Sequence, residues 1–575
     1  MKHLQALMLL GASIFATGGQ AIEYSDQAPL ADTLSATVKS CRAGTDSLSV
    51  PMRTSGVDII PLFANGYQTE SSADSIFSDN DITVSLFLEN DITEQVKKYL
   101  SCESPIMRGT QGMLNAVADL TENDPRTKQV AIYQHGYSNG ADAIVARGEL
   151  SSAADLSGAT IVTQAYGPHL AYLSRILADG QSAVERNGGT WESPTIRYTS
   201  SLMGFQGDTP GAAFLDDPEN DAVLVTSADA QTLTSGGNTG TGAEGSVKGA
   251  TIMLSTRSAN RIISEVYVVR ADYLEKNREQ VRNFVRAMFS AEEVFREDVV
   301  KQVVDWNAAG ELLLGDPGAD SEAKDLWRNV ETVGVDGNDR WSQADGSRSW
   351  KTMNNRIQSV MVASGLLSSA YDLTVADWDY SDVSGDVFDK RRAELPSFDS
   401  NATASAVKNM KESGELEENS LMEFEIHFQP NQRTFSQAEY RDEFDRVAEL
   451  AETYGGAVIT VEGHSDPMNY LRKKHNGESN HQLRSIRQAA KNLSMNRAIE
   501  VRDSVIEFAE DNRRTMDESQ FVTLGHGITE PKTGLCEGDP CPPQTEAEWK
   551  SNMRVTFKLV NVEAEASTFT PVNSW

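Results

Sequence analysis

Val461-Glu462-Gly463-His464-Ser465-Asp466, followed by Leu493-Ser494-Met495-Asn496-Arg497-Ala498 and by Asn552-Met553-Arg554-Val555, decides how the C-terminal part of this chain folds. The first segment places a carboxylate just past a predicted strand. The second places an arginine at the start of a predicted helix, and the third places another at the start of a late strand. If the three meet in one fold, they form a site for a ligand that carries both an ammonium and a carboxylate.

Strand and helix patterns alternate around these segments. Met422, Phe424, Ile426 and Phe428 alternate with polar residues, as in a half-buried strand, and residues 458–461 are a second strand. Capping residues and apolar stripes predict two helices, which begin near Ser436 and at Ser494. With a closing strand at residues 554–560, the order strand, helix, strand, helix, strand predicts a small α/β sandwich.

This order and its motifs, which include Gly525-His526-Gly527, resemble the OmpA-like peptidoglycan-binding domain over residues 421–562. The resemblance implies that Asp466 holds the ammonium, and Arg497 the carboxylate, of diaminopimelate in bacterial wall peptide. Asn552 and Arg554 match the family's Asn-Arg-Arg-Val, with Met553 in place of the middle arginine. A helix N-terminus at Ser494 would add partial positive charge.

The chain departs from that family between the two main motifs. Residues 467–492 are an insertion that the usual members lack, and it is basic in part. We expect this insertion to form an additional surface segment that contacts the glycan or another partner. The alternative for Asp466 and Arg497 themselves is a surface ion pair without a ligand.

The N-terminal two thirds show short β-rich runs between helical patterns. Predicted strands are residues 57–63, 82–88, 130–133, 144–146, 160–163, 222–226 and 266–269. The clearest helix covers residues 278–295, where Val281, Phe284, Val285 and Met288 form one apolar stripe. This alternation predicts α/β units on a mainly parallel sheet.

Three ordered segments, residues 141–147, 154–160 and 166–169, resemble type II periplasmic solute-binding proteins of ABC importers, near the nitrate, sulfonate and phosphate group and the thiamine-pyrimidine-synthase-like fold. The resemblance covers residues 55–390. It implies a two-lobed periplasmic-binding-protein fold, here followed by the small βαβαβ OmpA-like α/β sandwich. Such proteins hold a ligand in the cleft between their lobes.

The candidate cleft residues are those that follow predicted strands or open predicted helices. Backbone N–H groups at a helix N-terminus, hydroxyls and one arginine suit a small oxyanion such as phosphate. Each residue could equally be part of a turn or a helix cap. The candidates are Asn65, Gly66, Ser138, Asn139, Gly167, His169, Ser227 and Arg257.

The charge balance excludes some partners. The net charge is -33, with 84 acidic against 51 basic residues, which argues against nucleic acid because its binding depends on Lys and Arg at phosphates. The 8 histidines are scattered and no zinc-type cysteine spacing occurs. No Gly-x-Ser-x-Gly, HExxH or Walker motif occurs either. We therefore expect no metal, no cofactor and no catalysis.

The N-terminus and the cysteines indicate export. Residues 1–21 have a polar start, an apolar run and small residues before a cleavage point at Ala21, as in a signal peptide. Four cysteines in an exported chain suggest two disulfides, of which three pairings are possible. Locality favours Cys41–Cys102 and Cys536–Cys541. A leader at 22–54, a linker at 391–420 and a tail at 563–575 complete the organisation.

These features predict an exported protein of the Gram-negative periplasm, associated with the cell wall or outer membrane. It would bind a small solute between its lobes, with an ABC permease or an envelope protein as a further partner, and would be tethered to peptidoglycan through its C-terminal domain. The alternative is an envelope scaffold or sensor whose first domain binds a protein. A thiamine-pyrimidine enzyme is disfavoured because the Cys-rich segment it needs is absent.

Overall fold

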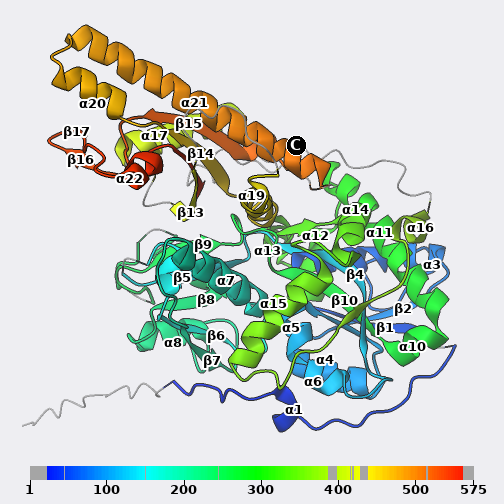
Figure 1. The fold of residues 1–575 in the computed structure, drawn as a ribbon. Helices are drawn as coiled ribbons and strands as arrows, with labels where there is room; N and C mark the ends of the chain where they lie inside the picture. The colour runs from blue at the N-terminus through cyan, green and yellow to red at the C-terminus, as the bar shows by residue number, and fades with distance from the viewer. Residues whose placement is uncertain are drawn as a thin grey trace, which may run out of the picture.

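The computed structural model describes residues 22–385, 398–427 and 438–560, apart from residues 45, 149, 238, 244, 415, 417–419, 513 and 515. The expected signal peptide at 1–21 and tail at 563–575 lie outside the described residues. The chain forms a two-lobed α/β domain and a smaller C-terminal α/β domain that lies on top of it (Figure 1).

The first lobe is built on a sheet with the strand order β11-β4-β10-β3, and β12 also pairs with β4. The central strand β10 is antiparallel to both β3 and β4. A parallel pair, β1 and β2, lies against β3. The strands are β1 (Leu48–Met52), β2 (Val84–Leu88), β3 (Ile106–Thr110), β4 (Gln129–Ser138), β10 (Ser264–Arg270), β11 (Val330–Thr332) and β12 (Thr374–Val375).

The second lobe is built on a sheet with the strand order β7-β6-β8-β5-β9. β6 is parallel to β7 and β8, whereas β5 is antiparallel to β8 and β9. Both sheets are therefore mixed, and the expectation of a mainly parallel sheet was wrong. The strands are β5 (Asp142–Ala146), β6 (Thr160–Gln164), β7 (Thr195–Thr199), β8 (Ala222–Thr226) and β9 (Thr251–Ser255).

The chain crosses between the two sheets twice. It leaves the first sheet at the end of β4 and enters the second at β5, and it returns through residues 256–263 from β9 to β10. These crossings form a hinge, and they define the two lobes that the sequence predicted. Residues 22–54 are not merely a leader, since β1 belongs to the first lobe.

Helices cover both sheets (Figure 1). Those used below are α5 (Gln111–Ala116), α7 (Leu170–Arg186), α9 (Ser227–Leu233), α11 (Arg278–Val300), α13 (Asp320–Arg328), α14 (Gly334–Ser342) and α15 (Trp350–Ala363). The apolar stripe predicted on residues 278–295 is fully buried on α11. Asn277 precedes α11, and its position and the Gln280 that follows predict a capping box, but the side-chain amide of Asn277 donates instead to the carbonyls of Arg42 and Tyr273.

The predicted strand at 57–63 is helical. Residues Gly56–Asp58 form a short 3₁₀ turn and α2 covers Ile59–Ala64. Val57, Ile59, Ile60 and Leu62 are all fully buried. A short apolar run that is buried on every side has no periodicity that separates strand from helix, so the β-branched residues alone misled the prediction.

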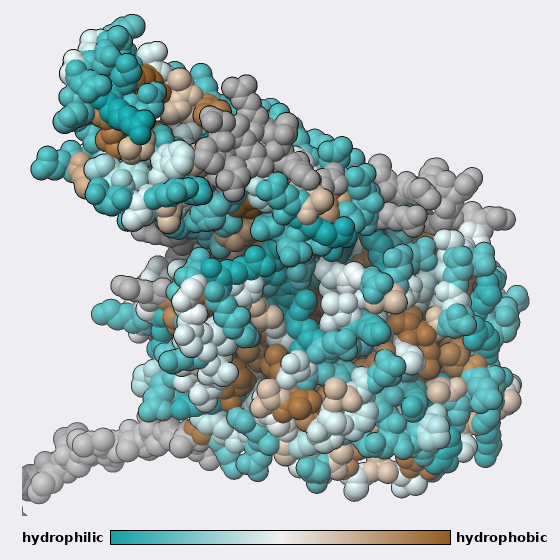
Figure 2. Space-filling view, in the orientation of Figure 1, coloured by the Kyte–Doolittle hydropathy of each residue, from teal (hydrophilic) through white to brown (hydrophobic). Residues whose placement is uncertain are grey.

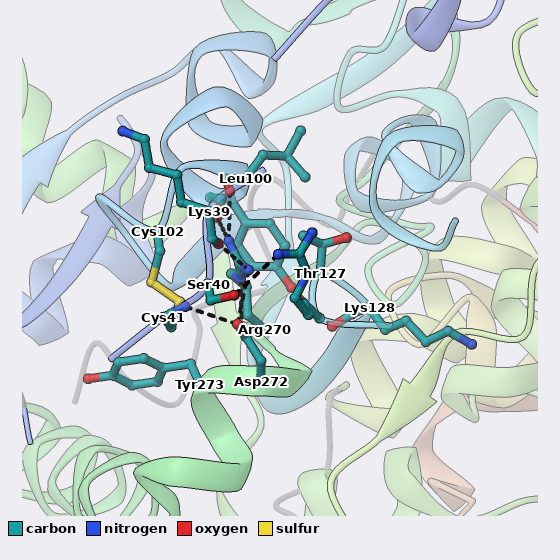
Figure 3. A network of polar contacts seen from close by, with 12 residues as sticks. Lys39, Ser40, Cys41, Leu100, Cys102, Thr127, Lys128, Arg270, Asp272 and Tyr273 are labelled. Carbon is teal, nitrogen blue, oxygen red and sulfur yellow. Dashed lines mark hydrogen bonds and ion pairs between the residues drawn. A yellow bond between two sulfur atoms is a disulfide. The ribbon is translucent and has the colours of Figure 1, made fainter. Parts of the chain in front are cut away.

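The N-terminal segment is fastened to the first lobe by Arg270, which lies at the centre of Figure 3. Its guanidinium donates to the carbonyl oxygens of Tyr99 and Leu100 at 2.8 Å and to that of Lys39 at 2.8 Å. The predicted Cys41–Cys102 disulfide is formed beside it. Charged hydrogen bonds and a covalent link therefore join residues far apart in sequence.

The C-terminal domain is a four-stranded sheet with the order β13-β18-β14-β15. It has one strand more than predicted, because the Gly525-His526-Gly527 segment ends strand β15. β14 and β15 are parallel, and β18 is antiparallel to β13 and β14. The elements are β13 (Ser420–His427), α19 (Arg441–Thr453), β14 (Val458–His464), α20 (Met468–His475), α21 (Asn480–Asp511), β15 (Phe521–Gly527), α22 (Glu546–Ser551) and β18 (Arg554–Val560).

The 467–492 insertion does not form a separate surface loop. It makes α20 and the first three turns of α21, which project from the domain at the upper left of Figure 1. Ser479 caps α21 in a capping box with Gln482. Ser494 therefore lies within a helix and caps no terminus, so the expected N-terminal charge at Ser494 is absent. Its hydroxyl instead accepts from Gly527 N at 2.9 Å and ties α21 to β15.

Part of the predicted linker at 391–420 is structured. α17 (Ser400–Ser413) packs Val407 and Met410 against Val458, Val522 and Val560 of the C-terminal sheet. The second predicted disulfide, Cys536–Cys541, is also formed. α17 thus belongs to the C-terminal domain rather than to a free connection.

The two domains share a buried contact. Tyr454, after α19, donates its hydroxyl to Asp179 of α7 at 2.6 Å, and Arg446 reaches the same carboxylate at 2.9 Å. Gly456 N donates to the carbonyl of Ser258 in the hinge at 3.2 Å. The C-terminal domain therefore contacts both the second lobe and the hinge.

The hydropathy of the surface differs between the C-terminal domain and the two-lobed domain. Hydrophilic side chains cover most of the projecting α20–α21 region, and apolar patches gather on the two-lobed domain below it (Figure 2). Among the residues that the structure describes, no helix is long and apolar enough to cross a membrane.

Candidate functional site

The space between the lobes contains one arginine without a partner. Arg53 follows β1 and is 9% exposed. Within the described ranges its guanidinium makes no hydrogen bond or ion pair, and its Nε is buried. Burial lowers the pKa of Arg53, and the carboxylates that oppose this effect include Glu265 of the first lobe and Asp142 of the second. Because Arg53 is buried between the lobes without a counter-charge, it is a candidate for binding an anion.

Asp142, at the start of β5, gathers the polar groups of the second lobe. Its two oxygens accept from Ser138 Oγ at 2.6 Å and contact His169 Nε2 at 2.8 Å. Thr256 Oγ1 lies 3.0 Å from Ser138 Oγ. The other ring nitrogen of His169, Nδ1, is buried without a partner. The structure thus brings together two predicted residues, Ser138 and His169, around a carboxylate that the sequence analysis missed.

The lobes are in direct contact beside this cluster. Thr110 Oγ1 donates to the carbonyl oxygen of Pro168 at 3.3 Å. A Cβ added to Gly112 would lie 2.9 Å from Ala171 N, so the starts of α5 and α7 touch. The lobes are therefore closed on each other, and glycine at position 112 is what permits the contact.

Behind Arg53 lies a buried ion network. Arg108 bridges Asp58, at 2.8 Å, and Glu265, and all three side chains are almost fully buried. Burial raises the pKa of Asp58 to about 6, because it outweighs the favourable charge of Arg108. Ser55 Oγ donates to Glu265 at 3.3 Å. This network fixes Glu265 at the edge of the site.

Four predicted contacts lie away from this cluster. Asn65 and Gly66 follow α2, where the Asn65 amide donates to the Gln68 carbonyl at 2.9 Å and closes a buried turn. Arg257 binds Asn329 at 3.1 Å on the hinge. Asn139 N donates to the Asn329 carbonyl at 2.8 Å. These residues hold turns and the hinge together, because the strand that was to position Asn65 is a helix.

The remaining two predicted contacts open helices. Gly167 precedes α7, and Ser227 is the first residue of α9 and donates its N–H to the Ala141 carbonyl at 2.7 Å. Ser227 therefore sits beside the first hinge crossing. No feature of the sequence distinguished Arg53 or Asp142 from other charged residues near strand ends.

Arg497 is the outstanding residue of the C-terminal domain. It lies on α21, is 6% exposed and has a buried Nε without a hydrogen-bond partner. It makes no ion pair with any described residue, Asp466 included, so the alternative of a simple Asp466–Arg497 pair does not hold here. Burial lowers the pKa of Arg497. A desolvated guanidinium without a counter-charge needs an anion from outside.

Gly463 allows the end of β14, which Asp466 follows, to lie against α21, which carries Arg497. A Cβ at Gly463 would lie 1.9 Å from the Ser494 carbonyl oxygen, so only glycine fits this crossing. Side chains on a helix lean toward its N-terminus, so Arg497 leans toward the turn of Ser494. The motif glycine thus explains how strand and helix come together at the site.

Asp466 follows β14 and is half-buried. Its Oδ1 accepts from Met468 N at 3.1 Å. Burial raises the pKa of Asp466, although a hydrogen bond from the Trp549 side chain opposes the shift. The carboxylate has no cationic partner within ion-pair distance among the described residues, which leaves it available to an ammonium.

Asn552 and Arg554 hold the surrounding loop and strand. Asn552 is fully buried, and its side chain meets the Thr533 backbone N–H at 3.4 Å. Arg554 Nε lies 3.0 Å from Glu425, and Nη2 donates to the Glu530 carbonyl at 3.3 Å. Val555 pairs with Gly463 in the sheet, so Arg554 lies at the same sheet end as Asp466.

A polar cluster lies on the face of the sheet opposite α21. It consists of Glu462, His464, His526 and Glu530, whose ligand atoms lie within 4.8 Å of one another. Glu462 contacts His526 at 3.0 Å and Lys558 at 3.5 Å. Lys411 of α17 lies 2.8 Å from His526 Nδ1. Two ammonium groups thus supply positive charge where a metal ion would sit, and the cluster fastens α17 to the sheet.

Replacing Glu462 with glutamine is expected to destabilise the C-terminal domain by about 3–5 kcal/mol, because it leaves buried charge uncompensated. Burial opposes the ionisation of Glu462, but His526 and Lys558 outweigh it and hold its pKa at about 2. Burial also opposes the charge of His526, but hydrogen bonds to Glu462 and Glu530 raise its pKa.

The sign of the pH dependence follows from these two shifts. The Glu462 contribution is present above its unfolded pKa of about 4.3 and disappears as the pH falls toward its folded value. The His526 contribution is present below about pH 6.5 and disappears as the pH rises through its folded pKa. Urea unfolding over a pH series should show both losses in the wild type. In Glu462→Gln the loss at low pH should be absent, and the His526 loss should be reduced to the part that Glu530 supplies. The exposed Glu546→Gln is the control, and equal pH profiles for all three would contradict the prediction.

No protein-family model matches the chain, and no curated protein matches it. Solved structures match. The periplasmic aliphatic sulphonate binding protein SsuA from Escherichia coli is 12% identical, with 61% of this chain and 97% of that chain covered and a TM-score of 0.37. A putative periplasmic sulfonate-binding protein SsuA from Methylobacillus flagellatus is 13% identical, covers 63% and 100%, and has a TM-score of 0.39.

A third match is the desulfurization enzyme DSZB, 14% identical, with 57% of this chain and 95% of that chain covered and a TM-score of 0.34. At these TM-scores the likeness carries no argument about function. The two-lobed fold rests on the strand orders of the two sheets and the two crossings between them.

Proposed function

We propose that this is an exported envelope protein that binds peptidoglycan through its C-terminal domain and a small anion between the lobes of its first domain. One observation supports both halves: each domain contains a buried arginine, Arg53 or Arg497, without a partner in the described part of the chain. Buried charges are normally paired. Two exceptions in one chain favour binding sites over structural roles, and binding over catalysis.

Arg497 and Asp466 suit the two ends of a zwitterion. A guanidinium takes a carboxylate in bidentate fashion, and a carboxylate takes an ammonium. Diaminopimelate in wall peptide carries both groups. Co-sedimentation of the exported protein with purified peptidoglycan tests this half, and a protein that stays in the supernatant would exclude it.

For the first domain, replacing Arg53 with alanine is expected to remove anion binding. Stabilisation by a ligand is RT ln(1 + [L]/Kd), so a ligand at about 100 times its Kd adds about 2.7 kcal/mol. A thermal-shift series with alkanesulfonates and nitrate should raise the wild-type melting temperature and leave Arg53→Ala unshifted. Arg197→Ala, a partly exposed arginine of the second lobe, is the control. If no anion shifts the wild type, this half of the proposal fails.

The closed lobes favour one further candidate. Because Thr110 and Pro168 already touch and Gly112 lies against Ala171, the domain reaches a closed form through its own contacts. A sensor or scaffold that offers its closed surface to an envelope protein would have this property. Replacing Gly112 with a larger residue would hold the lobes apart, and retained partner binding by that variant would exclude this alternative.

A further inference from the structure

Two adjoining cavities lie at the hinge, the larger against the first lobe and the smaller where the hinge, the second lobe and the C-terminal domain meet. The larger has a volume of about 130 Å³ and is bounded by the end of β4, the hinge, β11 and α14. The smaller is about 20 Å³ and is bounded by α7, the hinge, α15 and the end of α19. Arg261 and Arg348 line both, so the two spaces have a common wall of positive charge.

Arginine dominates these walls. The five lining arginines are Arg175, Arg261, Arg340, Arg348 and Arg356. The larger cavity also has Glu331 and Asp336 in its lining, whereas no acidic residue lines the smaller one. So many guanidinium groups around enclosed space repel one another unless anions lie between them.

Protein carboxylates neutralise only part of this charge. Arg175 binds Asp179 and Glu449 at 2.6 Å each, and Arg356 shares Glu449 at 3.2 Å. Arg261 lies 3.4 Å from Glu331. These contacts include none to Arg348, which lines both cavities.

Two arginines that line these cavities, Arg175 and Arg348, have polar groups without a described partner. Arg175 is 3% exposed, and its Nη2 is buried without a hydrogen-bond partner. Arg348 makes no hydrogen bond and no ion pair with any residue that the structure describes. Burial lowers the pKa of Arg348, and the neighbouring charge of Arg261 lowers it further. Arg175 therefore has an unused hydrogen-bond donor on the wall of the smaller cavity, and Arg348 has an unpaired charge on the walls of both.

We propose that this junction is a second anion site, which takes a small dianion of the size and geometry of phosphate. Guanidinium groups bind such oxygens in bidentate fashion. An engineered cavity of about 150 Å³ holds benzene, so a space of 130 Å³ has room for phosphate. The site is separate from Arg53 and Arg497 and does not depend on the function proposed for either.

The position of the site gives it a consequence. The walls of the smaller cavity come from the hinge through Arg261, from the second lobe through Arg175, and from the C-terminal domain through Thr453. The larger space, which has room for the dianion, is lined instead by Arg261 of the hinge and by Arg340 and Arg348. Bound phosphate therefore neutralises charge between the hinge and the first lobe and restrains the hinge.

The test uses the full-length exported protein, inorganic phosphate as probe and chloride at equal ionic strength as reference. Titration calorimetry should show phosphate binding that Arg348→Ala weakens by about tenfold or more, as expected for loss of a charge-assisted bidentate contact. Arg53→Ala should leave this binding intact. Arg328→Ala, an exposed arginine on α13, is the matched control.

A second measurement separates a ligand residue from a structural one. Because Arg348 pairs with no described carboxylate and the charges of Arg261 and Arg340 oppose its own, Arg348→Ala without phosphate should be about as stable as the wild type. In an Arg53→Ala background, which removes the site between the lobes, phosphate should raise the melting temperature, and adding Arg348→Ala should abolish that shift. Phosphate binding unchanged in Arg348→Ala would overturn the proposal. So would a marked loss of stability of the phosphate-free variant, since it would give Arg348 a structural role.

Discussion

Replacing Arg497 with alanine is expected to release the protein from peptidoglycan. Truncating one partner of a buried, hydrogen-bonded charge pair costs about 2–5 kcal/mol of binding free energy, which is at least about a thirtyfold loss of affinity. Arg497 has no hydrogen-bond or ion-pair partner to lose among the residues that the structure describes, so the folded domain should keep its stability. The measurement is co-sedimentation with purified wall, together with thermal unfolding of the free variant.

Two further variants sharpen this result. Arg497→Lys keeps the charge but loses the bidentate fork, so it should bind more weakly than the wild type and more tightly than Arg497→Ala. Arg502→Ala lies on the same helix, pairs only with the adjacent Asp503 and should bind like the wild type. If Arg497→Ala binds normally, the buried guanidinium has no role in wall binding.

Much of the fold could be predicted because the relevant signals are local. β8 was placed to the residue, since a short apolar run between turn residues has one simple interpretation in an α/β pattern. Both disulfides were paired correctly because each joins cysteines within one domain. The structure adds a reason for Gly463 in that motif, which is the close approach to Ser494.

Other features could not be predicted because they depend on long-range packing. The run at 57–63 is buried on all sides, and local periodicity does not decide its conformation. Ser494 looked like a cap, but the inserted residues 480–493 are themselves helical and continue into it. The contact between α19 and α7 joins residues more than 250 positions apart, and no local pattern reports it.

The candidate sites likewise include residues that local sequence signals identify and residues that only long-range packing brings together. Asp466 and Arg497 belong to an ordered motif, so the sequence could single them out. Arg53 and Asp142 are single charged residues at strand ends, and only the crossing of the chain between two sheets places them between the lobes. The arginines of the hinge junction come from five separate segments, which makes that cluster invisible in the sequence.

Replacing Asp179 with alanine is expected to undock the C-terminal domain. The carboxylate is 1% exposed and receives Arg175 Nε at 2.6 Å, Arg446 Nη2 at 2.9 Å and the Tyr454 hydroxyl at 2.6 Å. Removing it leaves Arg175 of one domain and Arg446 of the other with Glu449 as their one shared carboxylate in a buried interface, which costs about 3–5 kcal/mol. Calorimetry should show a single unfolding transition of the wild type divided into two, one for each domain.

The pH dependence and the matched variants test the same contact. Burial acts to raise the pKa of Asp179, but Arg175 and Arg446 outweigh it and the pKa is lowered. The contribution of Asp179 is therefore complete above about pH 4 and disappears as the pH falls below it, so acid should undock the wild type while the Asp179→Ala transitions stay unchanged.

Tyr454→Phe removes one hydrogen bond and should cost only about 1 kcal/mol, and the exposed Asp503→Ala should have no effect. A single transition in Asp179→Ala would mean that Asp179 is not needed to hold the domains together, since the Arg175–Glu449 contact at 2.6 Å and the shared core on Leu450, Tyr454 and Leu173 would then suffice.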